Sequence, residues 1–375
     1  MMRIGVVGAS GFVGNRAVEM LHVDGHEVRP IMRSAASLER FSHPHLDCRI
    51  ANSFDRSSLE VAFQDCDVII HSILGSQGLI RGSIVPTYEA AQRAGVRRIV
   101  YLSSMVVHTS APAPGTTEAT PPIVNQPFPT HNAKIYAERK LLQLRQKGAV
   151  EVTIFRPGIV FGPRSRWVED LADQLSQGNA YLLDRGTGIC NTVYIDNLIH
   201  AIRLALTVKE ADGEAFFVGD RERVTWFDFY QPFAQVFGVD LTQLPPATVP
   251  QFTHTWQQQT IDSVRNSELV QKAIASVSDE FKQQLKRSFL PNRNRLATES
   301  TPVVRSVPQP VVSEMMAILQ RSQYQLPFTK AQQILGYEPI ISVQEGCHRS
   351  IEWLAEIDRF QPILKSQVAH LRSRD

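Results

Sequence analysis

Between Arg3 and Phe155 the chain alternates short apolar runs with longer segments of helical periodicity, and this alternation restricts the fold more than any other feature. The expected strands are at 3–7, 27–32, 48–51, 68–71, 98–102 and 150–155, and the expected helices follow the first glycine turn to about residue 23 and then occupy 57–64, 83–94 and 131–146. Repeated strand and helix units of this length predict an α/β fold, with a parallel sheet that carries helices on both faces.

A glycine-rich turn, Gly8-Ala-Ser-Gly11-Phe-Val-Gly14, joins the first expected strand to the first expected helix. Such a turn brings backbone amides close to a diphosphate at a helix N-terminus, whose dipole favours anions. The alternative is a turn that only packs the helix on the strand. Together with the alternation, the motif predicts a Rossmann-type doubly wound parallel sheet that binds a dinucleotide beyond the carboxyl ends of its strands.

The end of the second strand bears on the kind of cofactor. An NAD site usually has Asp or Glu about 20 residues after the glycine turn, whereas an Arg there accommodates the 2′-phosphate of NADP. Here the sequence is Ile31-Met-Arg33-Ser34, without a carboxylate. We therefore expect a preference for NADP(H), with Arg33 binding the phosphate. NAD(H), with Arg33 merely solvated, is the alternative.

The helical segment 131–146 carries Tyr136 and Lys140 four residues apart, so their side chains lie on one face of the helix. A phenol ionises near pH ~10, and a neighbouring ammonium favours the phenolate, so the pair can supply a base near neutral pH. The Y-x-x-x-K spacing alone is a weak signal, because most such pairs are surface accidents. Its context decides its meaning.

The composition argues against several other classes of function. The chain has 375 residues, a net charge of +2 and interspersed charges, so we expect no nucleic-acid partner. The four cysteines lack C-x-x-C spacing, which argues against zinc or a disulfide framework and favours a cytoplasmic location. No apolar run approaches the ~20 residues of a spanning helix, so no membrane association is expected. His43-Pro-His45 has no companion ligands, and no metal site is expected.

Further motifs follow in a set order and carry a resemblance to a known family. They are Gly8-x-x-Gly11-x-x-Gly14, Asp67-Val-Ile-Ile-His71, Gly95-Val-Arg-Arg-Ile-Val-Tyr-Leu-Ser-Ser104, Tyr136-x-x-x-Lys140, Arg156-Pro157-Gly-Ile-Val-Phe-Gly162-Pro163, Val193-Tyr-Ile-Asp196-Asn197, Gly213-Glu-Ala-Phe-Phe-Val-Gly-Asp220 and Phe328-Thr-Lys-Ala-Gln-Gln-Ile-Leu-Gly-Tyr337. In this order they resemble the extended short-chain dehydrogenases/reductases, the family of NAD-dependent sugar epimerases and dehydratases. The resemblance covers about residues 1–238 and 325–355.

The resemblance implies catalytic roles for three residues. Tyr136 would be the acid/base on a substrate hydroxyl or carbonyl, Lys140 would lower its pKa and hold the nicotinamide ribose, and Ser104 would hydrogen-bond the same substrate oxygen. Removing a proton from an alcohol while a hydride leaves its carbon requires such a base and an oriented donor. The implied cofactor contacts are Gly8, Ser10, Gly11, Phe12, Val13, Gly14, Arg33, Asn52, Ser53, His71, Ser72, Ser103, Tyr136, Lys140, Arg156, Pro157 and Gly158.

The sequence also departs from the family pattern. Sugar 4,6-dehydratases carry an Asp-Glu pair directly after the catalytic Thr, and here those residues are Met105 and Val106. We therefore expect that the chain is not a 4,6-dehydratase. The Arg that commonly contacts the diphosphate of a UDP-sugar is missing near Cys190 or Asn191, which puts that contact in doubt.

The expected domain organisation is a cofactor-binding domain at 1–160, with contributions from about 190–220, and a mainly substrate-binding lobe at 161–375. An insert at about 239–325 is atypical of the family and is expected to contain an amphipathic helix at 268–290 and a loop at 291–312. The expected substrate contacts are Arg164, Arg166, Trp167 and Asn191.

Three functions remain open at this point. The first is an NAD(P)-dependent epimerase or ketoreductase acting on a sugar-like substrate, which the similarity to nucleotide-sugar enzymes favours. The second is a dehydrogenase or reductase of a steroid-like or other apolar alcohol, suggested by the missing Arg. The third is a non-catalytic NADP-binding regulator, against which the joint presence of Ser104, Tyr136 and Lys140 argues. A homodimer through two helices of the sheet domain is open as well.

Overall fold

The protein is built around a seven-stranded parallel sheet with the strand order β3-β2-β1-β4-β5-β6-β9. The computed structural model describes residues 1–39, 41, 43–244, 247, 249–252, 310 and 312–364. The strands of this sheet are β1 (Arg3–Val7), β2 (Glu27–Met32), β3 (Arg49–Ile50), β4 (Val68–His71), β5 (Arg98–Leu102), β6 (Glu151–Pro157) and β9 (Ala215–Val218). Every pairing is parallel, as the alternation of strands and helices predicts.

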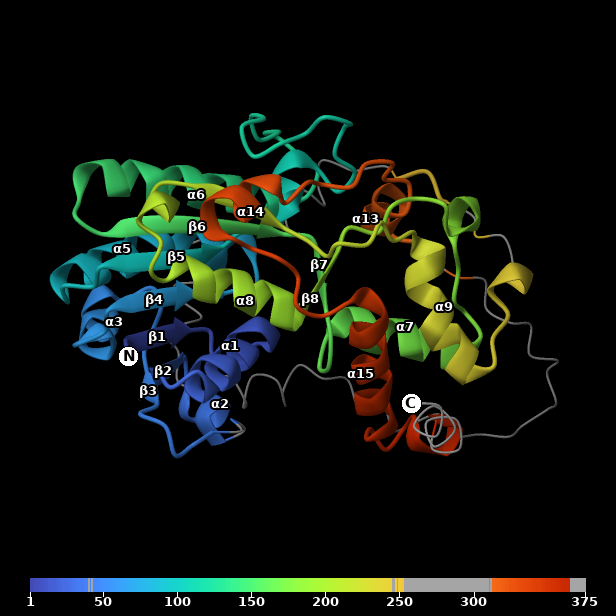
Figure 1. Ribbon diagram of the computed structural model, residues 1–375, viewed down its shortest axis with the longest axis horizontal. Coiled ribbons are helices and arrows are strands. Elements are labelled where there is room, and N and C mark those ends of the chain that lie inside the picture. The colour runs from blue at the N-terminus through green and yellow to red at the C-terminus, as the bar shows by residue number, and fades with distance from the viewer. Residues whose placement is uncertain are drawn as a thin grey trace, which may run out of the picture.

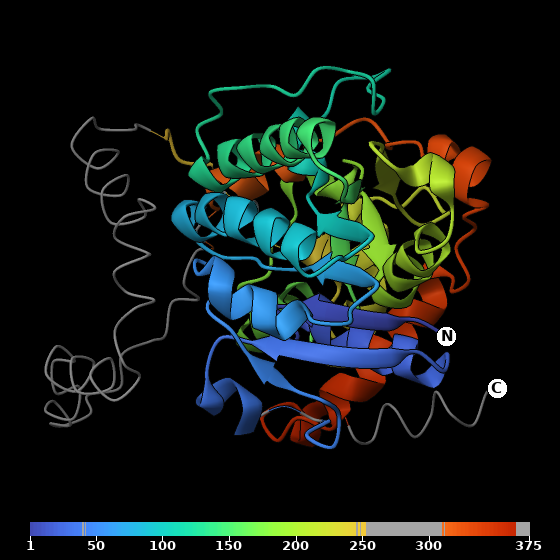
Figure 2. The same cartoon turned by 90° about the vertical axis from the view of Figure 1, so that its left-hand side faces the viewer.

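Helices cover both faces of the sheet, because successive strand residues point to opposite sides. One face packs against α1 (Phe12–Val23) and α8 (Ile195–Ala205), and the other against α3 (Arg56–Phe63), α5 (Ile84–Arg93) and α6 (Pro129–Lys147). Figure 2 shows α3, α5 and α6 side by side in blue, cyan and green. On β4 and β5, Ile69 and Ile99 enter the α3/α5/α6 core, and Ile70 and Val100 enter the other.

The second half of the chain adds a smaller lobe at one end of the sheet (Figure 1). The remaining strands and helices of the second half of the chain are β7 (Ile159–Phe161), β8 (Thr192–Tyr194), α7 (Arg166–Gln177), α9 (Trp226–Phe237), α13 (Glu314–Leu319), α14 (Thr329–Leu335) and α15 (Val343–Ala355). Three short 3-10 turns are η2 (Leu183–Gly186), η3 (Lys209–Ala211) and η4 (Leu241–Gln243). β7 and β8 form a two-stranded parallel sheet. The chain returns to the large sheet at α14, where Tyr337 Oη donates to the Gly219 carbonyl at 3.0 Å.

The expected element boundaries are close to those observed. The differences are a shorter β3, a β6 that continues to Pro157, and two short helices that were not expected, α2 (Ala35–Glu39) and α4 (Gln77–Gly82). Ser76 caps α4 by accepting from the Leu79 amide, and α5 starts directly afterwards. β4 therefore leads into two consecutive helices, α4 and α5, and not into one.

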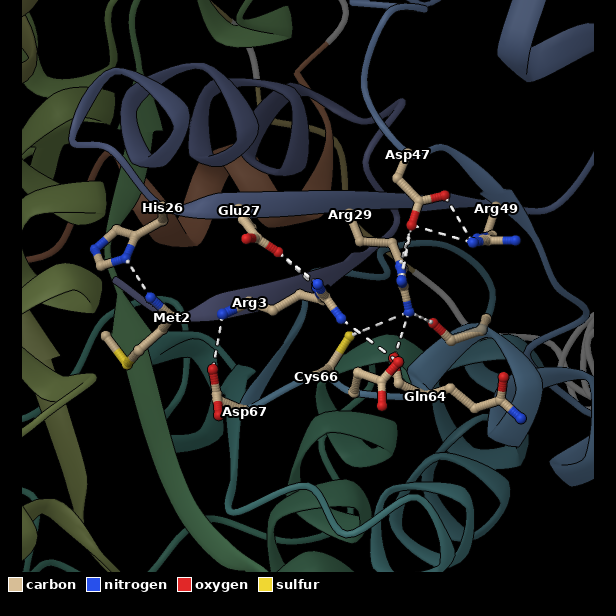
Figure 3. A network of polar contacts seen from close by, with 12 residues as sticks. Met2, Arg3, His26, Glu27, Arg29, Asp47, Arg49, Gln64, Cys66 and Asp67 are labelled. Carbon is tan, nitrogen blue, oxygen red and sulfur yellow. Dashed lines mark hydrogen bonds and ion pairs between the residues drawn. The ribbon is translucent and has the colours of Figure 1, made fainter.

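At the amino ends of the strands, a network of charged side chains ties neighbouring strands together (Figure 3). Arg3 pairs with Glu27 on β2 at 2.7 Å, and the Arg3 amide donates to Asp67. Arg29 is buried in β2 and donates to Asp47 and to the Gln64 carbonyl.

Two further arginines, Arg97 and Arg98, hold the amino ends of β5 and β6 through Glu151. They also donate to the last carbonyls of α8, those of Leu206 and Ala205. Cations at a helix C-terminus interact favourably with the helix dipole. The amino edge of the sheet is thus closed by paired charges.

The helix expected at 268–290 and nearly all of the loop expected at 291–312 lie outside the described residues. Among the residues that are described, no helix is long and apolar enough to cross a membrane. The division into a cofactor domain and a substrate lobe at residue 160 stays a prediction.

Candidate functional site

The glycine turn after β1 is packed too tightly for any other residue type at two of its positions. Gly8 has a φ of +87°, in the region that favours glycine. A Cβ atom on Gly14 would overlap the Gly8 carbonyl and lie 2.7 Å from Ser72 Oγ. Ser72 follows β4, and its Oγ donates to the Val7 carbonyl at 2.8 Å. The turn and the end of β4 are therefore locked together.

The N-terminus of α1, which begins at Phe12 within this turn, has the features of an anion site. The N-cap residue Gly11 provides no side-chain cap, and the first turn contains no acidic residue. Ser10 and Gly11 are exposed, so the amides that begin α1 at Phe12 and Val13 are not covered by a competing carboxylate. A diphosphate fits these free N–H groups and the dipole of the helix. The residues present therefore fit a dinucleotide.

Next to this turn, β2 and β3 bring Arg33 close to Asn52 and Ser53. The Ala51 amide donates to the Met32 carbonyl at 2.8 Å, which sets the two strand ends side by side. Arg33 is exposed and has no ion-pair partner within the described ranges. Asn52 Oδ1 accepts from the Phe54 amide and shapes the turn that follows β3. Arg33 is thus free to meet an anion at this edge.

At the end of β5, Ser103 and Ser104 leave the sheet in succession. The Ser103 amide donates to the Phe155 carbonyl of β6, while its Oγ is buried and has no hydrogen-bond partner among the described residues. Ser104 is half-buried and accepts from the Val106 amide as the cap of a short 3-10 helix, η1 (Met105–His108). An unpartnered buried hydroxyl at a strand end is a feature of binding sites.

Gln126 holds η1 against the first turn of α6. Its Nε2 donates to the Val106 carbonyl at 2.8 Å, and its Oε1 contacts His131 Nδ1 at 2.9 Å. Asn132 completes the clamp by bonding both the amide and the carbonyl of Gln126. The beginning of α6 is therefore fixed beside Ser104 and η1.

The face of α6 that meets the sheet carries a buried lysine, Lys134. Its Nζ donates to the Leu102 carbonyl at 2.6 Å, at the last residue of β5, and lies 5.0 Å from the centre of the Tyr101 ring. Burial lowers the pKa of Lys134 to about 8. This contact uses one of the three N–H groups of the ammonium. The sequence interpretation overlooked Lys134.

Tyr136 and Lys140 lie together on the outer side of α6, and not on the face that carries Lys134. Residues two apart in an α-helix differ by about 200° in direction, which separates Tyr136 from Lys134. Tyr136, Lys140, Asn132 and Arg139 line a groove of about 270 Å³, and the Arg81 guanidinium stacks 4.2 Å from the centre of the Tyr136 ring. The expectation that this pair faces the strand ends with Ser104 is not met.

Two further expected cofactor contacts have their side chains turned elsewhere. The Arg156 guanidinium is buried and pairs with Glu138 at 2.7 Å, and it also contacts His108 and the Glu118 carbonyl. The His71 ring is buried between β4 and the start of α5, with Nε2 3.1 Å from Ser83 Oγ. Both side chains therefore stabilise the fold, and the cofactor contacts expected of these two residues stay a prediction.

Three histidines near the carboxyl ends of the strands are kept neutral by burial. Burial lowers the pKa of His71 to about 3 and that of both His108 and His131 to about 4. The neighbouring cations Lys134 and Arg156 act in the same direction on His71 and His108. Within the described ranges, no group of three metal-ligating side chains has the geometry of a metal site.

The expected substrate contacts are spread over the lobe. Arg164 reaches back to α1 and donates to Asn15 at 2.7 Å, and Arg166 is exposed at the start of α7. Trp167 packs 6.4 Å from Trp226, ring centre to ring centre. The Asn191 side chain bonds the backbone of residues 324 and 326, so it is occupied by the returning chain.

At the end of β6, Gly158 follows Pro157 and lies against Asn191, directly before β8. A Cβ atom on Gly158 would overlap the Asn191 carbonyl, which accepts from the Ile159 amide at 2.7 Å. The close approach explains the glycine after Pro157. The end of β6 is thus joined to β8.

Comparison with known proteins relates this site to nicotinamide cofactors. A family model described as NAD(P)H-binding matches residues 8–168. Over 259 residues the chain is 26% identical to 3 beta-hydroxysteroid dehydrogenase/Delta 5-->4-isomerase of Mycobacterium tuberculosis, covering 63% of this chain and 70% of that protein. Over 232 residues it is 25% identical to N-acetyl-alpha-D-glucosaminyl-diphospho-ditrans,octacis-undecaprenol 4-epimerase of Escherichia coli O157:H7, covering 56% and 65%.

Solved structures share the fold over nearly the whole chain. UDP-glucose 4-epimerase of Thermotoga maritima aligns with a TM-score of 0.66 at 18% identity, covering 95% of this chain and 99% of that one. dTDP-glucose 4,6-dehydratase of Bacillus anthracis, in complex with NAD, aligns with a TM-score of 0.67 at 15% identity, covering 97% and 100%. The NAD(P)H-binding match, the relatives and the fold thus agree with the ordered motifs in making the chain similar to the extended short-chain dehydrogenases/reductases.

Proposed function

We propose that the protein is an oxidoreductase that transfers a hydride between a nicotinamide cofactor and a carbinol or ketone carbon. The observation that carries the proposal is the tight glycine turn, locked to Ser72 and leading into the uncapped start of α1, with Ser104 at a neighbouring strand end. A bound nicotinamide would supply or accept the hydride. The glycine turn would hold the diphosphate, and Ser104 would orient the reacting oxygen.

The preferred cofactor in this proposal is NADP(H), supported by the exposed and unpaired Arg33 at the end of β2. The test is to remove bound nucleotide and titrate the wild type and Arg33→Ser with NADPH and NADH by fluorescence. We expect the substitution to weaken NADPH binding roughly 10-fold and to leave NADH binding unchanged, because only NADPH has the 2′-phosphate. Arg93→Ser, an exposed arginine on α5, is the matched control.

Two results would count against this proposal. Tight, near-stoichiometric NAD+ retained through purification would favour an epimerase that keeps its cofactor, and would overturn the role of Arg33. No binding of either nucleotide would overturn the proposed function as a whole.

The first substrate candidate is a sugar-like polyol or ketone, supported by the relative from Escherichia coli that is named an epimerase. The second is a steroid-like or other apolar alcohol, supported by the relative named a 3 beta-hydroxysteroid dehydrogenase and by Asn191, whose side chain is occupied where a diphosphate-binding Arg is common. NADP+ reduction with UDP-glucose and with a 3β-hydroxysteroid distinguishes the two. We do not propose a 4,6-dehydratase, since Met105 and Val106 provide no acid or base.

The proposed substrates are small molecules, and the proposed location is the cytoplasm. The four cysteines are free, which suits a reducing compartment. A homodimer is the oligomeric state that we expect, and sedimentation at several protein concentrations tests this expectation. Absence of turnover with every ketone and alcohol offered, despite NADPH binding, would favour the regulator.

A further inference from the structure

The buried side of α6 carries its own pair of polar groups one turn apart. Thr130 and Lys134 are four residues apart and so point in nearly the same direction. The Thr130 hydroxyl has no hydrogen-bond partner within the described ranges, and Lys134 uses one N–H group on the Leu102 carbonyl. Two N–H groups of the ammonium are left for another acceptor at the end of β5.

No exchangeable phenol shares this side of the helix. Tyr136 projects about 200° away from Lys134 and stacks with Arg81. Tyr101 does meet Lys134, but it is fully buried, and burial raises the pKa of its phenol far above the usual range. The side chains that α6 directs toward the strand ends therefore lack the tyrosine expected from the sequence.

We propose that Thr130 and Lys134, and not Tyr136 and Lys140, are the polar groups of α6 that serve the reacting oxygen beside Ser104. This inference rests on the proposed hydride transfer. Gln126 supports it, because its contacts to η1 and His131 set the first turn of α6 beside Ser104. Thr130 touches the substrate, and Lys134 acts through Thr130.

The proton balance follows from these positions. When an alcohol carbon gives up a hydride, its O–H bond breaks, and the electron pair of that bond forms the C=O bond. The proton passes to the Thr130 hydroxyl oxygen, and the original Thr130 proton passes to the neutral Lys134 amine. The resulting ammonium returns one proton to solvent. Because burial lowers the pKa of Lys134 to about 8, the neutral amine is populated near neutral pH.

The first experiment needs no substrate. NADPH affinity is measured by fluorescence between pH 6.5 and 9.5 for the wild type, Lys134→Arg, Lys134→Met and Lys140→Met, after circular dichroism shows that each is folded. An ammonium near a bound anionic cofactor strengthens binding, so wild-type affinity should fall roughly 10-fold as pH rises through about 8. Lys134→Arg should bind tightly at every pH, because Arg keeps its charge.

The remaining variants complete this test. Lys134→Met should bind weakly at every pH, and Lys140→Met should behave as the wild type does. A pH-dependent affinity that survives in Lys134→Arg but disappears in Lys140→Met would overturn the inference. Loss of all nucleotide binding by the wild type would overturn the proposed function instead.

The second experiment measures NADP+ reduction with a 3β-hydroxysteroid. Thr130→Val and Lys134→Met should lower kcat roughly 100-fold, because a proton-transfer group contributes about that much. Thr130→Ser should keep the wild-type rate. The wild-type kcat should rise as pH passes about 8, where Lys134 becomes neutral, and Lys134→Arg should lack this rise. Tyr136→Phe and Lys140→Met should match the wild type. A 100-fold loss in Tyr136→Phe with full activity in Thr130→Val would overturn the inference.

Discussion

The two edges of the parallel sheet differ in how far their polar groups are satisfied. At the amino edge, Arg3, Arg29 and Arg98 pair with carboxylates and backbone carbonyls (Figure 3 shows the first two). At the carboxyl edge, Ser103 Oγ is buried without a described partner, and Lys134 uses one of its three N–H groups. The polar groups at the amino edge are thus paired, whereas the carboxyl edge has hydrogen-bond donors without a partner.

This difference separates stability from binding. A paired buried charge is costly to break, because its partner is left without compensation in a region of low dielectric constant. An unused donor costs stability until a ligand accepts from it. Substitutions at the amino edge should therefore change unfolding and not cofactor affinity, whereas those in the glycine turn at the carboxyl edge should change cofactor affinity.

The largest expected effect is at the amino edge. Arg98→Met removes a fully buried guanidinium that holds Glu151 and the end of α8. We expect the free energy of unfolding, measured in urea, to fall by about 3 kcal/mol with NADPH affinity unchanged. The control is Arg97→Met, whose exposed side chain pairs with the same carboxylate and should cost less than ~1 kcal/mol. A change in affinity that exceeds the change in stability would break the comparison.

Gly14→Ala tests the carboxyl edge. The added methyl group would overlap the Gly8 carbonyl, and overpacking of this kind costs about 1–3 kcal/mol. NADPH binding should weaken roughly 5- to 150-fold, because the glycine turn must shift. Gly219→Ala is the control, since its methyl group would meet only the Thr192 carbonyl at an ordinary 3.6 Å. Equal affinities of the two variants would contradict the role of the turn.

Acid should weaken the carboxyl edge first. His131 has a folded pKa of about 4, below its ordinary 6.5, so the unfolded state takes up a proton as pH falls below 6.5 while the folded state does not. The stability from the neutral ring is present above pH 6.5 and is lost as pH falls toward 4. Between pH 6.5 and 5 we expect a loss of about 2 kcal/mol from this group.

His131→Gln checks this expectation, because Gln can still bond Gln126 but does not titrate. Urea unfolding at pH 6.5 and pH 5 should show a smaller loss in the variant than in the wild type. Identical losses would mean that His131 does not contribute to the acid sensitivity, and that His71 and His108 carry it.

The smallest expected effect is that of Arg3→Ala. The Arg3 side chain is 35% exposed, and its pairs with Glu27 and Asp65 face solvent. Solvent and salt screen such pairs, so the urea midpoint should change little at low salt and not at all at high salt. A large loss would show that the amino-edge network acts as one unit and would sharpen the contrast with the carboxyl edge.

The fold followed from the sequence because its signals are local and repeated. Apolar runs such as Val68–His71 form buried strands with the expected bounds. The glycine turn has one sterically permitted arrangement at Gly14, so its structure was equally predictable. The short helices α2 and α4 were missed because helices of five or six residues give too few turns for a periodic pattern.

The site was less predictable, because a spacing motif does not say which side of a helix is buried. Tyr136-x-x-x-Lys140 and Thr130-x-x-x-Lys134 lie on different sides of the same helix. The apolar positions Ala133, Ala137 and Leu141 are all buried in α6, and together they mark its inner side. That periodicity places Lys134 nearer the core than Tyr136, and it was the signal available in the sequence. The clamp of Gln126 depends on a contact between loop and helix that no local pattern encodes.

One contact of the segment before α6 bears on how the protein stays in solution. β9 is the last strand of the sheet, and Glu118 accepts from its Phe217 amide at 2.9 Å, on the side away from β6. Arg156 donates to the backbone carbonyl of Glu118. An exposed strand edge is a template for pairing with another chain. By occupying an outward amide of β9, Glu118 leaves one backbone donor fewer at this edge for the strand of another chain to pair with.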